Sequence, residues 1–131
     1  MIDDDAIDHP DVIAEVRDAF EAYEAALVAN DVEAMDAWFW EDARVVRFGL
    51  AERQYGHEAI AAWRATATPV PADRVVGPVV VTALGPDVAV VACEFRSGSV
   101  VEVGRQSQTW VRRPEGWRIA HAHVSAPPEP A

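Results

Sequence analysis

The chain contains no lysine, and all eleven of its basic residues are arginine. The absence of lysine excludes a Schiff-base mechanism, because that chemistry needs a primary amine on a protein side chain. Arginine instead offers a planar guanidinium that can bind a carboxylate through two parallel hydrogen bonds. The basic residues of this chain are therefore suited to recognising carboxylates.

Cysteine and long apolar runs are also scarce. Cys93 is the single cysteine, which excludes an intramolecular disulfide and a cysteine-based metal cluster. It lies among valines, so we expect a buried and unreactive thiol. No apolar run reaches 18 residues, and the acidic start MIDDDAID lacks the pattern of a signal peptide. We therefore expect a cytoplasmic protein.

Acidic residues outnumber basic ones, and the net charge is -11. This charge argues against nucleic acid and anionic membrane surfaces as partners. Of the 22 acidic residues, 14 fall within residues 1–42, where Arg17 is the only basic residue. The other arginines all follow, so the later part of the chain is the basic part.

The chain has the size and composition of one domain, spanning residues 1–131. With 50% hydrophobic residues it can bury a normal core. The acidic arm of residues 1–9 and the proline-rich tail of residues 126–131 have little to pack, and we expect both to be flexible.

Three helices are predicted ahead of most of the strands. The first begins near Pro10 and ends near Asn30, and Asp31 can cap a second, shorter helix. A third follows Gly56 and stops before residues 68–71, which contain two prolines. The first helix carries one apolar stripe at helical spacing, made of Val12, Val16, Phe20, Tyr23 and Leu27.

The predicted strands lie at residues 43–49, 75–84 and 88–95 and in a long hairpin over residues 104–125. In the first strand, Val46 and Phe48 are expected to form the core face, with Val45 and Arg47 on the other. Arg47 then lies either on the solvent side of the sheet or in a polar pocket, where its guanidinium would be near the Tyr23 hydroxyl. This order of elements predicts an α+β fold in which a curved antiparallel sheet wraps the first helix. Such a fold leaves a pocket between helix and sheet.

The two faces of the hairpin can be assigned if its turn is a three-residue loop, which places Arg113 opposite Trp117. One face then carries Arg105, Ser107, Thr109, Val111, Ile119, His121, His123 and Ser125. The other carries Gln106, Gln108, Trp110, Ala120, Ala122 and Val124. Only one of these faces can line the pocket.

The hairpin GRQSQTWVRRPEGWRIAHAHVS, with RFGLAERQYGHEAIAAWR and FEAYEAAL, resembles the AtzH-like family. This family is a branch of the SnoaL-like, NTF2-like cone fold, and the resemblance covers about residues 10–125. It implies a small enzyme of ureide or cyanuric-acid catabolism that works without a cofactor. The implied reaction removes one carboxylate from 1,3-dicarboxyurea to leave allophanate. Tyr23 and Arg47 match the tyrosine and arginine that are the proposed catalytic pair of the family.

Arg47 is suited to binding a carboxylate, while Tyr23 can donate a hydrogen bond or a proton; a plain core tyrosine is the alternative. Gln106 and Gln108 are suited to a urea carbonyl. The hairpin also looks like the association domain of calmodulin-dependent kinase, where the counterpart of Gln108 lines the pocket, and this favours the glutamine face. His123 is a further candidate, as a substrate-binding acid or base beside Arg105 and Ser125.

His121 and His123 share a strand face without a third ligand at fitting spacing, so we expect no metal site. A sheet covered on one side only leaves an apolar outer face, which predicts a homodimer. Two other functions stay open. The fold can serve as a non-catalytic binding or oligomerisation module, or as a SnoaL-type cyclase or isomerase with Glu94 or Glu102 as its acid or base.

Overall fold

A computed structural model gives the structure of the protein and describes residues 1–98 and 102–128. Within these ranges the elements are a 3-10 helix Asp4–Ala6, α1 Pro10–Ala29, α2 Val32–Trp38, β1 Val46–Phe48, β2 Arg53–Tyr55, α3 His57–Arg64, β3 Arg74–Ala83, β4 Val88–Ser97, β5 Gly104–Arg113 and β6 Gly116–Ser125. The predicted α+β fold is confirmed.

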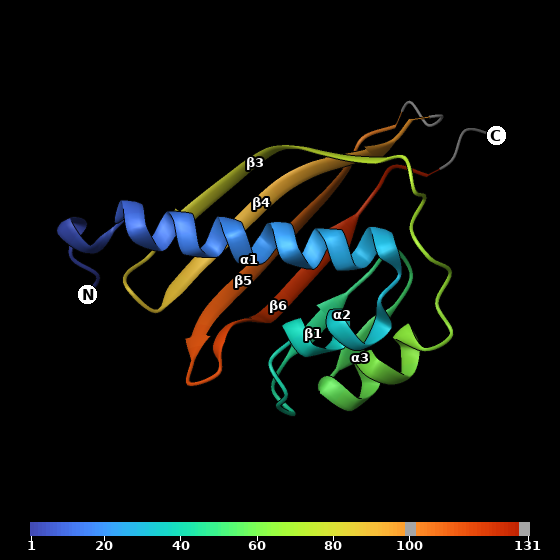
Figure 1. Cartoon of the computed structure of the whole chain (residues 1–131), viewed down its shortest axis with the longest axis horizontal. Coiled ribbons are helices and arrows are strands. Elements are labelled where there is room, and N and C mark those ends of the chain that lie inside the picture. The colour runs from blue at the N-terminus through green and yellow to red at the C-terminus, as the bar shows by residue number, and fades with distance from the viewer. Residues whose placement is uncertain (99–101, 129–131) are drawn as a thin grey trace.

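The described strands form one sheet in the order β2-β1-β6-β5-β4-β3. Neighbouring strands are antiparallel except β1 and β6, which run parallel. Helix α1 lies across one face of the long strands β3 to β6, and α2 and α3 gather near its C-terminal end, beside β1 (Figure 1). We call the face toward α1 the inner face and the opposite one the outer face.

Helix α1 forms where its apolar stripe predicts it. Pro10 occupies the first turn, and Asn30 ends the helix in the left-handed conformation with φ 52°. Asp31 then caps α2 by accepting a 3.1 Å hydrogen bond from the Ala34 N–H. All five residues of the stripe are buried.

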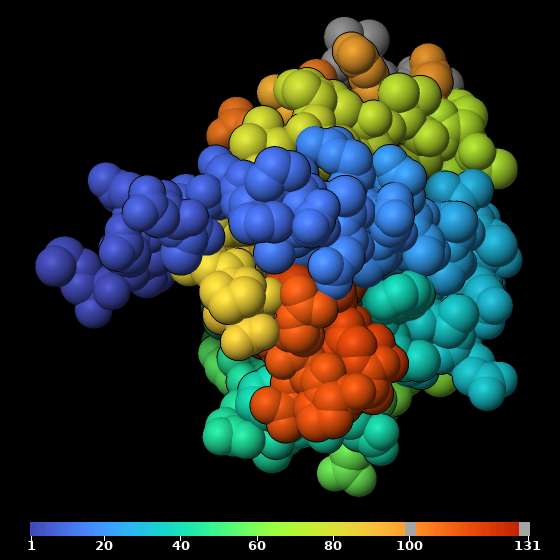
Figure 2. Space-filling model, turned by 60° about the vertical axis from the view of Figure 1, so that its left-hand side comes forward, coloured from blue at the N-terminus to red at the C-terminus, as the bar shows by residue number. Residues whose placement is uncertain are grey.

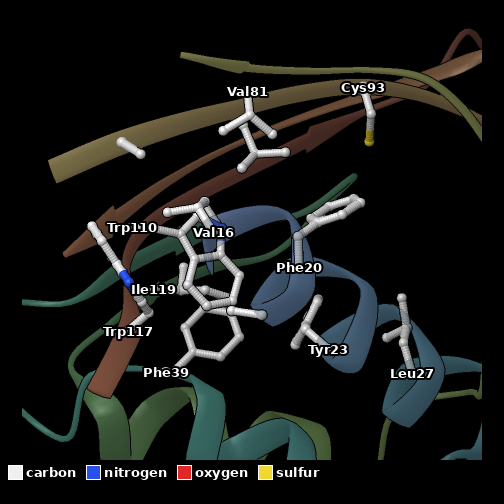
Figure 3. Close-up of a cluster of buried hydrophobic side chains, with 14 of the residues drawn as sticks. Val16, Phe20, Tyr23, Leu27, Phe39, Val81, Cys93, Trp110, Trp117 and Ile119 are labelled. Atoms are coloured by element: carbon white, nitrogen blue, oxygen red, sulfur yellow. The ribbon is translucent and has the colours of Figure 1, made fainter. Parts of the chain in front are cut away.

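The core lies between α1 and the inner face of the sheet. Trp110 and Ile119 are fully buried there, and Phe39 is 1% exposed. Figure 3 shows Val16 beside Trp110, with Phe20, Tyr23 and Leu27 following along the same side of α1. The aromatic residues fill the space toward the N-terminal half of the helix, and Tyr23 and Leu27 line a cavity near its C-terminal end.

The register of the β5–β6 hairpin differs from the prediction. Arg113 pairs with Gly116 across a two-residue turn, and the register shifts between Thr109 and Trp110. The predicted pairing holds from Thr109 back to the start of β5. Trp110 therefore pairs with Ile119. Ile119 lies on the inner face, and the prediction that it shares a face with His121 is wrong. The two-residue turn shifts the strand pairing by one residue from the predicted register. The irregularity between Thr109 and Trp110 restores the predicted register beyond that point.

The first strand is shorter than predicted, and β2 forms where a loop is expected. The prediction that Val46 and Phe48 face the core is wrong. The Phe48 ring lies on the outer face, with its centroid 6.1 Å from that of His121 and 5.8 Å from that of His123. Arg47 takes the inner face instead.

The acidic arm is attached to the end of β3. The Asp8 N–H donates to the Ala83 carbonyl, and the Asp8 carboxylate accepts from the Ala83 N–H, both at 2.9 Å. The residues before this contact project beyond the body of the molecule (Figure 2). None of the helices among the described residues has the length and apolar character needed to cross a membrane.

Candidate functional site

A cavity of about 300 Å³ lies between the C-terminal half of α1 and the inner face of the sheet. Tyr23 and Leu27 line it from α1, Arg47 from β1, and Trp63 and Arg64 from α3. Gln106, Gln108, Ala122 and Val124 line it from the hairpin. The cavity therefore combines an apolar wall with a cluster of hydrogen-bond donors.

Arg47 is buried at one side of this cavity, with only 8% of its surface exposed. Its Nη1 donates a 3.0 Å hydrogen bond to Oε1 of Gln54, the residue opposite on β2. Its guanidinium lies 3.8 Å from the centroid of the Trp63 ring. A cross-strand partner and an aromatic face thus fix the orientation of Arg47.

The charge of Arg47 is only weakly compensated. The Glu52 carboxylate is 3.9 Å from Nη1, and its side chain is 29% exposed. Burial lowers the pKa of the Arg47 guanidinium, and the charge of Arg64 lowers that pKa further. Arginine still remains protonated at neutral pH, so the cavity holds a cation with anion-binding capacity.

Gly49 makes room for this arrangement. A β-carbon at Gly49 would lie 2.8 Å from Nη1 of Arg47 and 2.9 Å from Oε1 of Glu52. Both distances are shorter than van der Waals contact allows, so any larger residue here requires these two side chains to move. The RFG sequence therefore supplies both the cation and the space beside it.

Arg64 is a second buried arginine in the cavity, 6% exposed. Its Nη2 donates a 3.3 Å hydrogen bond to the Tyr23 hydroxyl. Because the Tyr23 oxygen accepts this bond, its own proton is free to be donated elsewhere. The Arg64 guanidinium lies 5.0 Å from the Trp63 ring centroid, so the same indole contacts both arginines.

Gln108 is held by the core beneath it. Its Oε1 accepts a 2.9 Å hydrogen bond from Nε1 of Trp110, which can only donate. The amide NH₂ group of Gln108 therefore remains available, and the side chain borders the cavity. This geometry provides a neutral donor for a carbonyl or carboxylate oxygen.

Gln106 belongs to a separate buried cluster at the edge of the cavity. Its Nε2 donates to Glu24 at 2.7 Å and to the sulfur of Cys93 at 3.3 Å. Arg74 donates two further bonds to Glu24, at 3.0 and 3.3 Å, and stacks on Phe95. The Arg74 charge is thus neutralised by Glu24, unlike those of Arg47 and Arg64.

His123 does not line this cavity, and its predicted role in substrate binding stays a prediction. With Arg105 and Ser125 it lines an open hollow of about 370 Å³ on the outer face. The outer hollow is the larger of the two, but the inner cavity is the stronger candidate site because its charged groups are buried. The strand alternation that turns Gln106 and Gln108 inward turns His123 outward.

Neither acidic candidate for an isomerase lines the inner cavity. Glu94 is exposed on β4, pairs in register with Arg105, and lines the outer hollow. Glu102 is not among the residues that line the inner cavity. Within residues 1–98 and 102–128, no three histidine, cysteine, aspartate or glutamate side chains are grouped as a metal site.

Four residues of the site escape the sequence analysis: Arg64, Gln54, and the paired Glu24 and Arg74. Arg64 follows Ile60 by four residues, so helical spacing alone places both on one side of α3. Arg74 precedes Val76 by two residues and shares its strand face. Both spacings can be read from the sequence and indicate that Arg64 and Arg74 share a face with an apolar residue. Gln54 had none, because β2 is a three-residue strand in a segment expected to be a loop.

A curved sheet wrapped around a long helix, with a cavity between them, defines the NTF2-like class, also called the cystatin-like fold. The chain belongs to the AtzH-like family, whose model matches residues 5–130.

Two solved structures share much of the sequence. A cystatin-like fold protein from Burkholderia xenovorans is 49% identical, with a TM-score of 0.89 over 95% of this chain and 98% of that one. A protein of unknown function from the DUF3225 family of Pectobacterium atrosepticum is 43% identical, with a TM-score of 0.93 over 98% and 100%.

An NTF2-like superfamily protein from Salmonella enterica is 20% identical and shares the fold, with a TM-score of 0.70 over 92% of this chain and 94% of that one. No curated protein matches the sequence.

Proposed function

We propose that the protein is an enzyme that removes a carboxylate from a small N-carboxylated urea, such as 1,3-dicarboxyurea, and releases allophanate. Arg47 binds a carboxylate of the substrate, and Tyr23 donates a hydrogen bond or proton where charge develops. Gln108 donates to the urea carbonyl. The resemblance to the AtzH-like family implies this substrate class, and family membership supports it.

The observation that carries the proposal is a pair of buried arginines beside the Tyr23 hydroxyl in one cavity. Arg47 and Arg64 are 8% and 6% exposed; among the described residues Arg47 has only the 3.9 Å contact with Glu52, and Arg64 has no ion pair. Burying such charges costs free energy unless an anion compensates them. A small carboxylate is therefore the ligand class that this cavity favours.

The reaction needs only proton transfer and electrostatic stabilisation from the protein. The C–N bond of the N-carboxylate breaks, its electron pair stays on nitrogen, and carbon dioxide leaves. Tyr23 delivers a proton to that nitrogen and recovers one from solvent. Hydrolysis gives the same urea product with bicarbonate in place of carbon dioxide, so isotope-labelled water separates the two routes.

Turnover of 1,3-dicarboxyurea by the purified protein tests this function. Tyr23→Phe removes one hydroxyl and is expected to lower kcat by roughly 10²-fold or more, as for loss of a positioned proton donor. Arg47→Ala is expected to raise KM strongly, because a bidentate carboxylate contact is lost. Allophanate production is the measurement, corrected for spontaneous decay of the substrate.

The chain provides matched controls. Tyr55 is the only other tyrosine and is 64% exposed, so Tyr55→Phe should retain full activity. Arg96 is exposed on β4, so Arg96→Ala should also be active. If the wild-type protein accelerates neither decarboxylation nor hydrolysis of 1,3-dicarboxyurea, the proposed enzymatic function is refuted. If it nevertheless binds dicarboxylates, the cone acts as a non-catalytic binding module.

We also propose that the protein forms a homodimer through the outer face of its sheet. Val75 and Val80 on β3 are 53% and 57% exposed on that face. The open hollow beside Val80 is lined by Ala92 and Ser107, small residues that a second sheet can approach closely. Pairing of two copies removes these apolar groups from water.

A further inference from the structure

We propose that Arg64 is the second carboxylate-binding residue of the cavity and makes the site select dicarboxylates over monocarboxylates of the same length. This inference rests on the proposed function and narrows its substrate class to small molecules with a carboxylate at each end. One carboxylate lies against Arg47 and the other against Arg64, the two arginines that contact Trp63.

The first support is the charge balance of the cavity. None of the ion pairs among the described residues includes Arg64, and Arg47 has only the 3.9 Å contact with Glu52. Asp36 on α2 is near enough for the Arg64 charge to lower the pKa of its carboxyl, while burial raises that pKa, but the two side chains form no ion pair among the described residues. With Glu52 set against Arg47 and Glu24 against Arg74, the cavity keeps one positive charge in excess, that of Arg64.

The second support is an unused donor. Nε of Arg64 is buried and has no hydrogen-bond partner among the described residues. A buried N–H without a partner costs about 1–3 kcal/mol, and a charged donor costs more. Such a donor at the wall of a cavity is expected to bind a ligand oxygen. Nη2 carries two N–H groups and gives one to Tyr23, so its second N–H, Nη1 and Nε remain for a carboxylate.

The third support is the contrast with Arg74. This arginine also lines the cavity, but Glu24 and Phe95 satisfy its guanidinium. Arg74 therefore has a carboxylate at hydrogen-bond distance, whereas Arg47 has only the 3.9 Å contact with Glu52 and Arg64 has no ion pair among the described residues. Two arginines that contact the same indole, one weakly paired and one without an ion pair among the described residues, fit one ligand with two negative ends.

Binding of malonate and of its monoamide, malonamate, tests this inference without turnover. The two probes have the same length and differ in the charge of one end. We expect the wild-type protein to bind malonate at least tenfold more tightly by calorimetry, a difference of about 1.4 kcal/mol. Arg64→Met should reduce this preference to about onefold, with malonamate binding retained through Arg47.

A second variant, Arg64→Lys, keeps the charge and guards against misfolding of Arg64→Met. It should prefer malonate, but less than the wild type, because lysine lacks the planar fork. Equal wild-type affinities for the two probes overturn the inference, as does an unchanged preference in either Arg64 variant. Failure of the proposed enzyme appears separately, as selective malonate binding without turnover of dicarboxyurea.

Discussion

The buried ion pair between Glu24 and Arg74 should contribute far more to stability than a similar pair at the surface. Both pairs join a glutamate of α1 to an arginine of the sheet. In the buried pair the side chains of Arg74 and Glu24 are 7% and 12% exposed. In the exposed pair, those of Arg112 and Glu15 are 36% and 45% exposed. Glu→Gln at each position removes one charge and little volume.

Glu24→Gln leaves the Arg74 guanidinium buried without a counter-charge. Breaking a buried pair in this way costs about 3–5 kcal/mol, and we expect about 3 because the amide oxygen still accepts a hydrogen bond. With an m-value of about 1.5 kcal/mol/M, the urea midpoint falls by about 2 M. The melting temperature falls by roughly 10 °C.

Urea unfolding of the wild type and both variants, at one protein concentration, measures the difference. Glu15→Gln should leave the midpoint nearly unchanged, because solvent already screens the exposed pair. Equal losses in the two variants would refute the reasoning, since burial would then not determine the strength of these pairs. A large loss at Glu15 alone would contradict it equally.

Two further predictions concern the surface. Hydrogen bonds from Arg44 lower the pKa of Asp42 from 3.8 to about 2, so the stabilisation from this carboxylate persists above pH 3.8 and is lost between 3.8 and about 2. Carbon NMR of the side-chain carboxyl should show this midpoint and its return toward 3.8 in Arg44→Gln; a wild-type midpoint near 3.8 would contradict the pairing. Light scattering should give the mass of two chains for the wild type and of one for Val80→Glu, whereas a wild-type monomer would exclude the dimer.

Much of the fold follows from local patterns in the sequence. The stripe from Val12 to Leu27 predicts α1, and the capping aspartate Asp31 predicts the start of α2. The valine runs predict β3 and β4 to within two residues at each end. These predictions succeed because helix and strand periodicity reflect which side of a single element is buried.

The candidate site is predictable only in part. Tyr23 is predicted to be buried, and a resemblance marks it and Arg47 as functional, but no local pattern places Arg47 on the inner face. Its own strand is three residues long, too short for alternation to identify a face. The inward direction of Arg47 is determined by the neighbouring strands β6 and β2 and by Trp63 of α3, which packs against its guanidinium.

The sequence by itself determined the helices, the long strands and the supply of arginine as the only cation. The tertiary structure alone decided which arginines remain unpaired. Arg64 meets Tyr23 across 41 residues of chain, and Arg74 meets Glu24 across 50. The placement of α3 relative to α1 decides the first meeting, and strand register contributes to the second, because a shift of one residue turns a strand side chain to the opposite face. The hairpin shows this directly, since one irregularity moves Ile119 into the core and leaves His121 and His123 outside.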